Sequence, residues 1–242
     1  MFFLCSSFNT NEWFDGVRTP VVIQDDNLFV TNLKKHIPGY NRVVIIANNQ
    51  FDHETNDYKS GIVFESLDMT GLKFKEKFIL DSRNKKDARE IIMGADLLML
   101  SGGKLVCQLE LFHEINLKEL IDENDRCVVM GGSAGAMNLC EVVLDFPESS
   151  MEVDGRVGDE YFLKGLGFHN EIIVPHFDGT TKYNKKYEFD IDIMGDYILP
   201  LSKGKEFIAY DDDSYIMTDG IRPQYFGTFY TIRDGEITRR KT

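Results

Sequence analysis

Residues 128–137 read VVMGGSAGAM, an apolar run that ends in small residues around a single hydroxyl, that of Ser133. The run predicts a buried strand, and we expect a helix to begin near Ala134. A strand that turns at once into a helix strains the backbone at the turn, where bulky neighbours would clash. The stretch therefore predicts a tight strand-to-helix corner that raises the Ser133 hydroxyl above the end of a sheet.

Short apolar runs alternate with longer amphipathic stretches on both sides of this corner. We expect strands at 1–5, 42–47, 72–80, 95–103, 127–132 and 171–175, and helices at 26–37, 56–70, 81–93 and 108–121. Continuous apolar strands separated by helices are typical of a mostly parallel sheet with helices on both faces. Ligands bind such sheets beyond the carboxyl ends of the strands, where SGGK (101–104) and GGSAGA (131–136) both fall.

The C-terminal part has a different pattern. Two apolar stretches, 206–210 and 214–218, flank three consecutive acids at 211–213. Residues 223–237 predict antiparallel strands with a turn at Asp234–Gly235. We find no internal repeat and no domain boundary, so residues 1–242 are expected to form a single α/β domain with a small antiparallel C-terminal extension.

Charge and composition exclude several classes of partner. The 242 residues carry a formal charge of −13, which argues against nucleic acid and against an anionic membrane surface. Solubility alone is the favoured explanation of this acidity. No apolar run approaches the roughly 20 residues of a membrane span, and the N-terminus lacks the basic and apolar regions of a signal peptide. We therefore expect a cytoplasmic protein.

The four cysteines are scattered without the C-x-x-C spacing of a metal or redox site. Two of them lie at or beside apolar, strand-like runs. They are expected to be free thiols in a reducing compartment rather than a disulfide framework or zinc ligands. Their positions are Cys5, Cys107, Cys127 and Cys140.

Gly131, Ser133 and Gly135 satisfy the pattern G-x-S-x-G between a predicted strand and a predicted helix. This is the context of a nucleophile elbow, in which the following helix also points free N–H groups at a developing oxyanion. Two other interpretations stay open: a tight packing turn, and a glycine loop that cradles phosphate. The phosphate loop is less favoured because the stretch lacks both the GK[ST] ending and the later glycine of G-x-G-x-x-G.

A serine nucleophile needs a base. His176 is the candidate, because it follows the apolar run 171–175 and so emerges at the edge of the sheet where ligands bind. A histidine at a strand end can equally be structural. The remaining histidines lie on predicted helix faces, in a polar loop or before a strand, where surface or capping roles suffice: His36, His53, His113 and His169.

Several stretches between about 95 and 217 resemble the peptidase E (aspartyl dipeptidase, S51) family of serine peptidases, in particular its type 1 glutamine amidotransferase-like branch. They are ADLLMLSGG (95–103), QLELFHEINLKELI (108–121), VVMGGSAGAMNLCEVVLDFPE (128–148) and GLGFHNEIIVPHFD (165–178). The resemblance implies a three-layer sandwich of the class I glutamine amidotransferase-like, or flavodoxin-like, type. Glutamine amidotransferases have cysteine at the elbow, whereas this chain has serine.

The resemblance also implies roles for individual residues. Ser133 corresponds to the nucleophile and His176 to the general base. The backbone N–H groups of Gly103 and Ala134 correspond to the oxyanion hole.

The third member of the triad is open between two acids, Glu148 and Asp212. Each corresponds to an acidic position of the family. The chemistry requires a carboxylate within hydrogen-bond reach of Nδ1 of His176. We favour Asp212 slightly, because its acidic run lies at another predicted strand end.

The chain departs from the family at two places. Lys104 stands where a small polar residue typically follows the paired glycines, and we take it as a candidate substrate-binding residue. The stretch DGTTKYNKKYEFD (178–190) replaces an arginine-bearing segment that helps recognise an acidic residue. Lysine does not reproduce the bidentate fork of arginine, so the resemblance leaves open whether aspartyl specificity is kept. The lysines of this stretch either take the place of the arginine in recognising an acidic residue or form a solvated helix face. They are Lys182, Lys185 and Lys186.

These observations predict serine-type hydrolysis of small peptides or other amides by a monomer or homodimer, with no metal or organic cofactor implied. One alternative is an acyl hydrolase acting on an acidic polymer or an ester, since relatives cleave the aspartyl-arginine polymer cyanophycin. The other alternative is a non-catalytic member of the fold that binds a small ligand or regulates. The departures around Lys104 and after His176 motivate this last reading.

Overall fold

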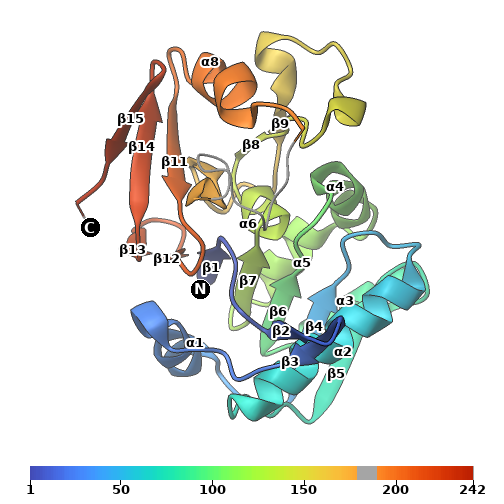
Figure 1. The fold of residues 1–242 in the computed structure, drawn as a ribbon. Helices are drawn as coiled ribbons and strands as arrows, with labels where there is room; N and C mark the ends of the chain where they lie inside the picture. The colour runs from blue at the N-terminus through green and yellow to red at the C-terminus, as the bar shows by residue number, and fades with distance from the viewer. Residues whose placement is uncertain (179–189, 242) are drawn as a thin grey trace.

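A seven-stranded sheet runs through the centre of the molecule (Figure 1). The computed structural model describes residues 1–178 and 190–241. The sheet order is β13-β12-β1-β7-β6-β4-β5. β1, β7, β6, β4 and β5 are parallel, β12 pairs antiparallel with β1, and β13 pairs antiparallel with β12. The strands are β1 (Phe2–Cys5), β4 (Arg42–Ile46), β5 (Glu76–Leu80), β6 (Leu97–Leu100), β7 (Val128–Gly132), β12 (Tyr215–Thr218) and β13 (Gln224–Phe226).

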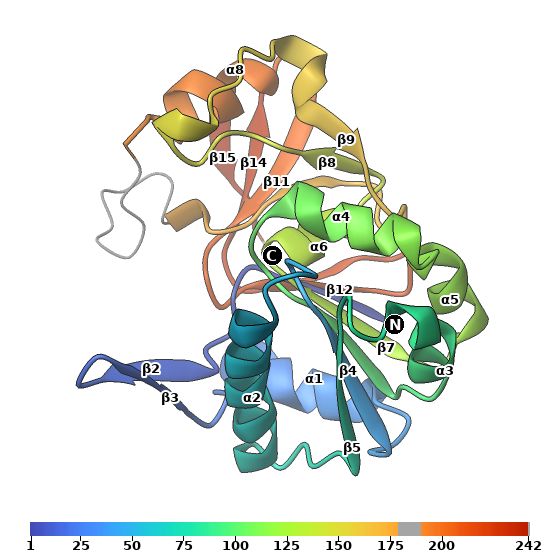
Figure 2. The ribbon, with the colours of Figure 1, turned by 90° about the vertical axis from the view of Figure 1, so that its right-hand side faces the viewer.

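Helices cover both faces of this sheet because its strands are apolar on both sides (Figure 2). In β4, Val43 and Ile45 pack in one core cluster, and Val44 and Ile46 in the other. The first cluster includes side chains of α1 (Phe29–His36) and α2 (His53–Met69). The second includes side chains of α3 (Ala88–Met93), α4 (Leu105–Glu114), α5 (Leu117–Glu123) and α6 (Ala134–Asn138). The predicted α/β sandwich is therefore confirmed.

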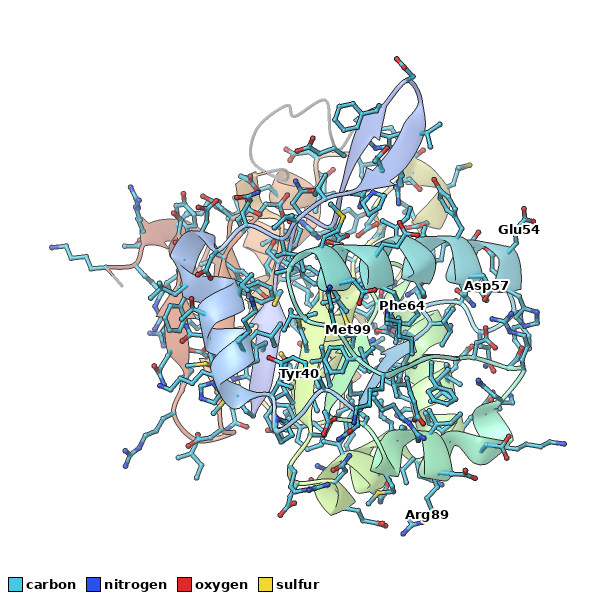
Figure 3. All side chains as sticks on the ribbon, turned by 90° about the horizontal axis from the view of Figure 1, so that it is seen from below. Tyr40, Glu54, Asp57, Phe64, Arg89 and Met99 are labelled. Atoms are coloured by element: carbon cyan, nitrogen blue, oxygen red, sulfur yellow. The ribbon has the colours of Figure 1, made fainter. Side chains whose placement is uncertain are left out.

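Figure 3 views these layers from below. Phe64 of α2 and Met99 of β6 lie in the layer between helix and sheet, whereas Glu54, Asp57 and Arg89 point to solvent. Burial of the inward apolar side chains is what holds the helices on the sheet.

A second, four-stranded sheet lies beside the first, in the order β10-β11-β14-β15. Its strands are β10 (Ile172–Val174), β11 (Glu206–Tyr210), β14 (Phe229–Arg233) and β15 (Glu236–Arg239). β10 and β11 are parallel, and the other pairs are antiparallel. The C-terminal part is thus more than an extension, because the chain leaves β11, adds β12 and β13 to the central sheet and returns to β14. This sheet has its own core, shared with a π-helical turn at Met194–Ile198 and α8 (Leu199–Leu201).

Two hairpins have no counterpart in the sequence prediction. β2 (Asn11–Phe14) pairs with β3 (Val17–Pro20), and β8 (Val142–Leu144) pairs with β9 (Phe162–Lys164). Single 3-10 turns lie at Asp26–Leu28, Lys85–Asp87, Ser150–Glu152 and Gly158–Tyr161. No helix within residues 1–178 and 190–241 is long and apolar enough to cross a bilayer.

Two predicted helices differ in extent from the observed ones. The helix expected at 108–121 is divided into α4 and α5, because Asn116 has a left-handed backbone with φ of 52°. The helix expected from Asp81 begins later, because Asp81 accepts hydrogen bonds from the backbone and guanidinium of Arg83 instead of capping a helix.

Candidate active site

Ser133 occupies the corner between β7 and α6 with φ of 51° and ψ of −118°, a sparsely populated conformation that costs about 1–3 kcal/mol. The neighbouring glycines allow this corner. A Cβ on Gly131 would lie 2.5 Å from the amide nitrogen of Ala136, and one on Gly135 would lie 2.3 Å from the carbonyl oxygen of Leu100. The small residues around Ser133 are therefore a steric requirement of the turn.

The loop after β6 lies against this corner. A Cβ on Gly102 would come within 3.1 Å of the Cβ of Ser133. The next residue, Gly103, has φ of 129°, which favours glycine. Asn48 holds the loop in place: its Oδ1 accepts the N–H of Lys104 at 2.9 Å, and its Nδ2 donates to the carbonyl of Lys104 at 2.8 Å.

His176 and Asp212 meet beyond the ends of two neighbouring strands. β10 and β11 are parallel, with Val174 opposite Ala209, so the residues that follow each strand emerge side by side. Nδ1 of His176 lies 2.6 Å from Oδ1 of Asp212, and the side chains are 21% and 10% exposed. His176 has φ of 59°, a second left-handed residue at this edge.

Ser6 connects this pair to the corner of Ser133. The Ser6 hydroxyl accepts the backbone N–H of His176 at 2.7 Å and donates to Oδ1 of Asp212 at 3.0 Å. The backbone N–H of Ser133 points at the carbonyls of Cys5 (2.9 Å) and Ser6 (3.0 Å). The ends of β1, β7, β10 and β11 thus meet at one buried serine.

A family model described as peptidase family S51 matches residues 54–220 of this chain. The chain belongs to peptidase family S51. The matched residues include Ser133, His176 and Asp212, whereas Ser6 and Asn48 precede them. No curated protein is similar enough in sequence to match the chain.

Solved structures of peptidases have the same fold. A peptidase from an acI-B1 Actinobacterium is 17% identical with a TM-score of 0.65, over 99% of this chain and 93% of that one. A putative peptidase E protein from Listeria monocytogenes EGD-e is 14% identical with a TM-score of 0.55, over 93% of this chain and 96% of that one. At such identities the likeness concerns the fold.

Ser133 of this S51 chain opens into a cavity of about 490 Å³. The other predicted site residues Gly103, Lys104, Ala134 and Glu148 line the same cavity. The structure therefore brings the Ser133 corner, both predicted oxyanion donors and one candidate acid together.

Glu148 differs from Asp212 in its surroundings. Glu148 is solvent-exposed as a whole residue. Its carboxyl nevertheless has a raised pKa, because the surrounding protein atoms partly exclude water from it and the carboxylate of Glu152 lies nearby, while His176 lowers the pKa. The backbone N–H of Glu148 donates to Glu152 at 3.0 Å. Of the two candidate acids, Asp212 hydrogen-bonds with Nδ1 of His176, and Glu148 lines the cavity instead.

The charges of the cavity are mostly negative. Arg156 donates to Asp145 and to Asp154, at 2.7 Å each. Lys104 is 4.0 Å from Glu152, and its side chain is 76% exposed. Across the described residues, no group of three or more His, Cys, Asp or Glu is arranged to hold a metal ion.

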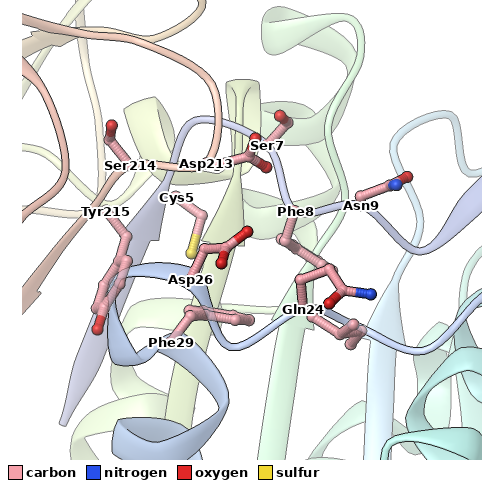
Figure 4. A pocket seen from close by; sticks show the side chains of 11 residues that line it. Cys5, Ser7, Phe8, Asn9, Gln24, Asp26, Phe29, Asp213, Ser214 and Tyr215 are labelled. Carbon is pink, nitrogen blue, oxygen red and sulfur yellow. The ribbon is translucent and has the colours of Figure 1, made fainter.

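A second cavity, of about 230 Å³, lies on the α1 side of β1 (Figure 4). Cys5, Ser7 and Asp213 line it, so residues next to Ser6 and Asp212 in sequence face this second cavity. Asp212 contacts His176 from the turn after β11, whereas Asp213 of the same turn, with φ of 63°, lines this cavity.

The remaining sequence candidates have other surroundings. His36 contacts the carbonyl of Asn32, His53 the hydroxyl of Ser82, and His169 the carboxylate of Glu171, and His113 is exposed. Cys5, Cys127 and Cys140 are buried free thiols, whereas Cys107 is partly exposed in the Ser133 cavity. Lys182, Lys185 and Lys186 lie outside the described residues.

Sequence reasoning missed Ser6 and Asn48. Ser6 directly follows β1, and Asn48 is the second residue after β4. The same strand-end rule could have found them.

Proposed function

We propose that this S51 chain is a serine-type hydrolase in which Ser133 is the nucleophile, His176 the general base and Asp212 the acid that orients it. The observation that carries the proposal is the 2.6 Å contact between Nδ1 of His176 and Oδ1 of Asp212. A carboxylate on Nδ1 leaves Nε2 as the basic nitrogen and stabilises the imidazolium that forms during proton transfer.

Catalysis proceeds by acyl transfer. His176 removes the proton of the Ser133 hydroxyl as its oxygen attacks the substrate carbonyl carbon. The backbone N–H groups of Gly103 and Ala134 hold the oxyanion, and His176 then protonates the leaving amine. Water, deprotonated by His176, attacks the acyl carbon. The bond to the Ser133 oxygen then breaks, His176 returns the proton to that oxygen, and the acid is released.

Two features support this mechanism: the strained corner at Ser133, and the loop at Gly103 and Lys104 that Asn48 holds by hydrogen bonds. The crowded corner fixes the backbone of Ser133, so the nucleophile needs little reorganisation. Asn48 holds both backbone groups of Lys104, which restricts the adjoining amide of Gly103.

The substrate we propose is a small peptide with a neutral or basic residue at the Ser133 cavity. Among the described lining residues, four carboxylates face two cations, and Arg156 is already paired with two of those carboxylates. An acidic side chain would meet repulsion there, and an ammonium group would be favoured. Aspartyl specificity is accordingly not proposed.

Labelling with a fluorophosphonate probe tests the mechanism without knowledge of the substrate. We expect stoichiometric labelling of the unmodified protein and none of Ser133→Ala, with strong slowing in His176→Ala. Labelling of folded Ser133→Ala would overturn the assignment of the nucleophile. A panel of Asp-X, Ala-X and Lys-X dipeptides, acidic polymer and simple esters then tests the substrate, and a preference for Asp-X or the polymer would contradict the proposed cavity electrostatics.

A further inference from the structure

We infer that Ser6 is a positioning residue of the active site, which fixes His176 and Asp212 relative to each other and to the strand of Ser133. The inference rests on the proposed function, since it assigns Ser6 a part in aligning the proposed base and acid. Ser6 lies outside the segment that matches the family model, 54–220.

Three strands bring Ser6 to this place. Parallel pairing of β1 and β7 sets Cys5 opposite Gly132, so Ser6 lies beside Ser133. Antiparallel pairing of β1 and β12 sets Cys5 opposite Tyr215, and the N–H of Ser6 donates to the carbonyl of Ser214 at 3.0 Å. The backbone of Ser6 is therefore hydrogen-bonded on both sides, to Ser133 and to Ser214, independently of its side chain.

The hydroxyl of Ser6 uses both of its hydrogen-bonding roles on the proposed base and acid. It accepts from the backbone of His176 at 2.7 Å and donates to Oδ1 of Asp212 at 3.0 Å, and Ser6 is 0% exposed. The same carboxylate oxygen faces Nδ1 of His176. The Ser6 hydroxyl oxygen thus orients the carboxylate of Asp212 and also holds the backbone of His176, which has a positive φ.

Removing the hydroxyl loosens two contacts at once. The N–H of His176 loses its acceptor, and Asp212 loses one of the donors that fix its rotamer. The imidazole is then held less rigidly, and misplacement of a catalytic base costs about 10- to 100-fold in rate. We expect the effect in the acylation rate rather than in substrate binding.

The test compares Ser6→Ala with Ser7→Ala, its neighbour that faces the second cavity. Ser6→Ala is expected to lower the second-order rate of fluorophosphonate labelling about 10- to 100-fold, and Ser7→Ala to change it less than about threefold. With a dipeptide substrate, kcat should fall and KM stay nearly constant. The downfield proton resonance of the His176–Asp212 hydrogen bond should broaden or shift in Ser6→Ala and stay unchanged in Ser7→Ala.

Two further variants keep the test decisive. Ser6→Cys preserves most of the side-chain volume, but its thiol forms only weak hydrogen bonds, so we expect it to slow labelling as Ser6→Ala does. It replaces Ser6→Ala in the test if that variant does not fold. Ser6→Thr restores a hydroxyl and should recover labelling. The inference is overturned by a folded Ser6→Ala or Ser6→Cys protein with an unchanged labelling rate and imidazole resonance. Absence of Ser133-dependent labelling in the unmodified protein overturns instead the proposed function.

Discussion

Asn48 hydrogen-bonds both backbone groups of Lys104, at 2.9 and 2.8 Å, and so holds the loop that contains Gly103. Asn48→Ala should leave that loop free to rotate and weaken the oxyanion hole. Loss of a direct donor costs about 100- to 1,000-fold, and we expect about 10-fold here because Asn48 acts through the loop. The rate of fluorophosphonate labelling measures the loss. Asn49→Ala, at the neighbouring exposed position, is the matched control, and an equal effect in both variants would contradict the assignment.

Asp212, not Glu148, should be the acid required for acylation. Asp212→Asn keeps the size of the side chain but removes the charge opposite the imidazolium, and should slow labelling by about 1,000- to 10,000-fold. Glu148→Gln should change it less than about 10-fold, because Nδ1 of His176 is already occupied by Asp212.

Asp213→Asn is the matched control for Asp212→Asn. Asp213 lies on the same loop but lines the second cavity, and its φ of 63° suits asparagine. Labelling of Asp213→Asn should stay within about threefold of the unmodified rate. A larger loss in Glu148→Gln than in Asp212→Asn would reverse the assignment of the acid.

The glycines of the corner should differ sharply in tolerance to alanine. Gly135→Ala places a Cβ against the backbone oxygen of Leu100, and should lower the free energy of unfolding by at least about 2 kcal/mol. Gly132→Ala meets only the ring edge of Phe8 at 3.4 Å, an ordinary contact, and should change it by less than about 1 kcal/mol. Urea unfolding followed by circular dichroism measures both. Equal stabilities would show that the corner has more room than its geometry indicates.

Stability should depend on pH through Glu148. A carboxyl whose pKa is higher in the folded than in the unfolded protein binds more protons when folded, so its ionisation opposes folding as pH rises. The penalty is absent below the ordinary glutamate pKa of about 4.3 and complete above the raised folded value. Glu148→Gln should therefore be more stable than the unmodified protein near pH 8, with the difference vanishing near pH 4. Glu110→Gln, on the exposed face of α4, controls for the loss of net charge; the same gain there would contradict a local origin.

Cys107 should be the reactive thiol of the native protein. Burial raises the pKa of Cys127 to about 12 and raises the pKa values of Cys5 and Cys140 as well, whereas Cys107 is partly exposed beside Ser133. A bulky maleimide should modify Cys107 in the native state and slow fluorophosphonate labelling at least about 10-fold by filling the cavity. Mass spectrometry locates the adduct. Cys107→Ser should make labelling insensitive to maleimide, and modification of Cys5 instead would refute the prediction.

Much of the candidate site could be predicted from short stretches of the sequence. The glycines around Ser133 predict a corner because a side chain at Gly131 or Gly135 has no space there. The position of His176 after a strand predicts its place at the edge of the sheet. The division of the C-terminal strands between two sheets was not predictable, because antiparallel strands of similar length and composition fit either sheet.

The alternation of apolar runs with amphipathic stretches was sufficient to predict the α/β class, and the small residues around Ser133 were sufficient to predict its corner, because both patterns can be read within short stretches of sequence. Only the tertiary structure decided which acid meets His176 and that Ser6 joins them. The choice depends on the parallel pairing of β10 with β11 and of β1 with β7, whose partners are far apart along the chain. Pairing of that kind is selected by packing across the whole sheet, and no short stretch of residues encodes it.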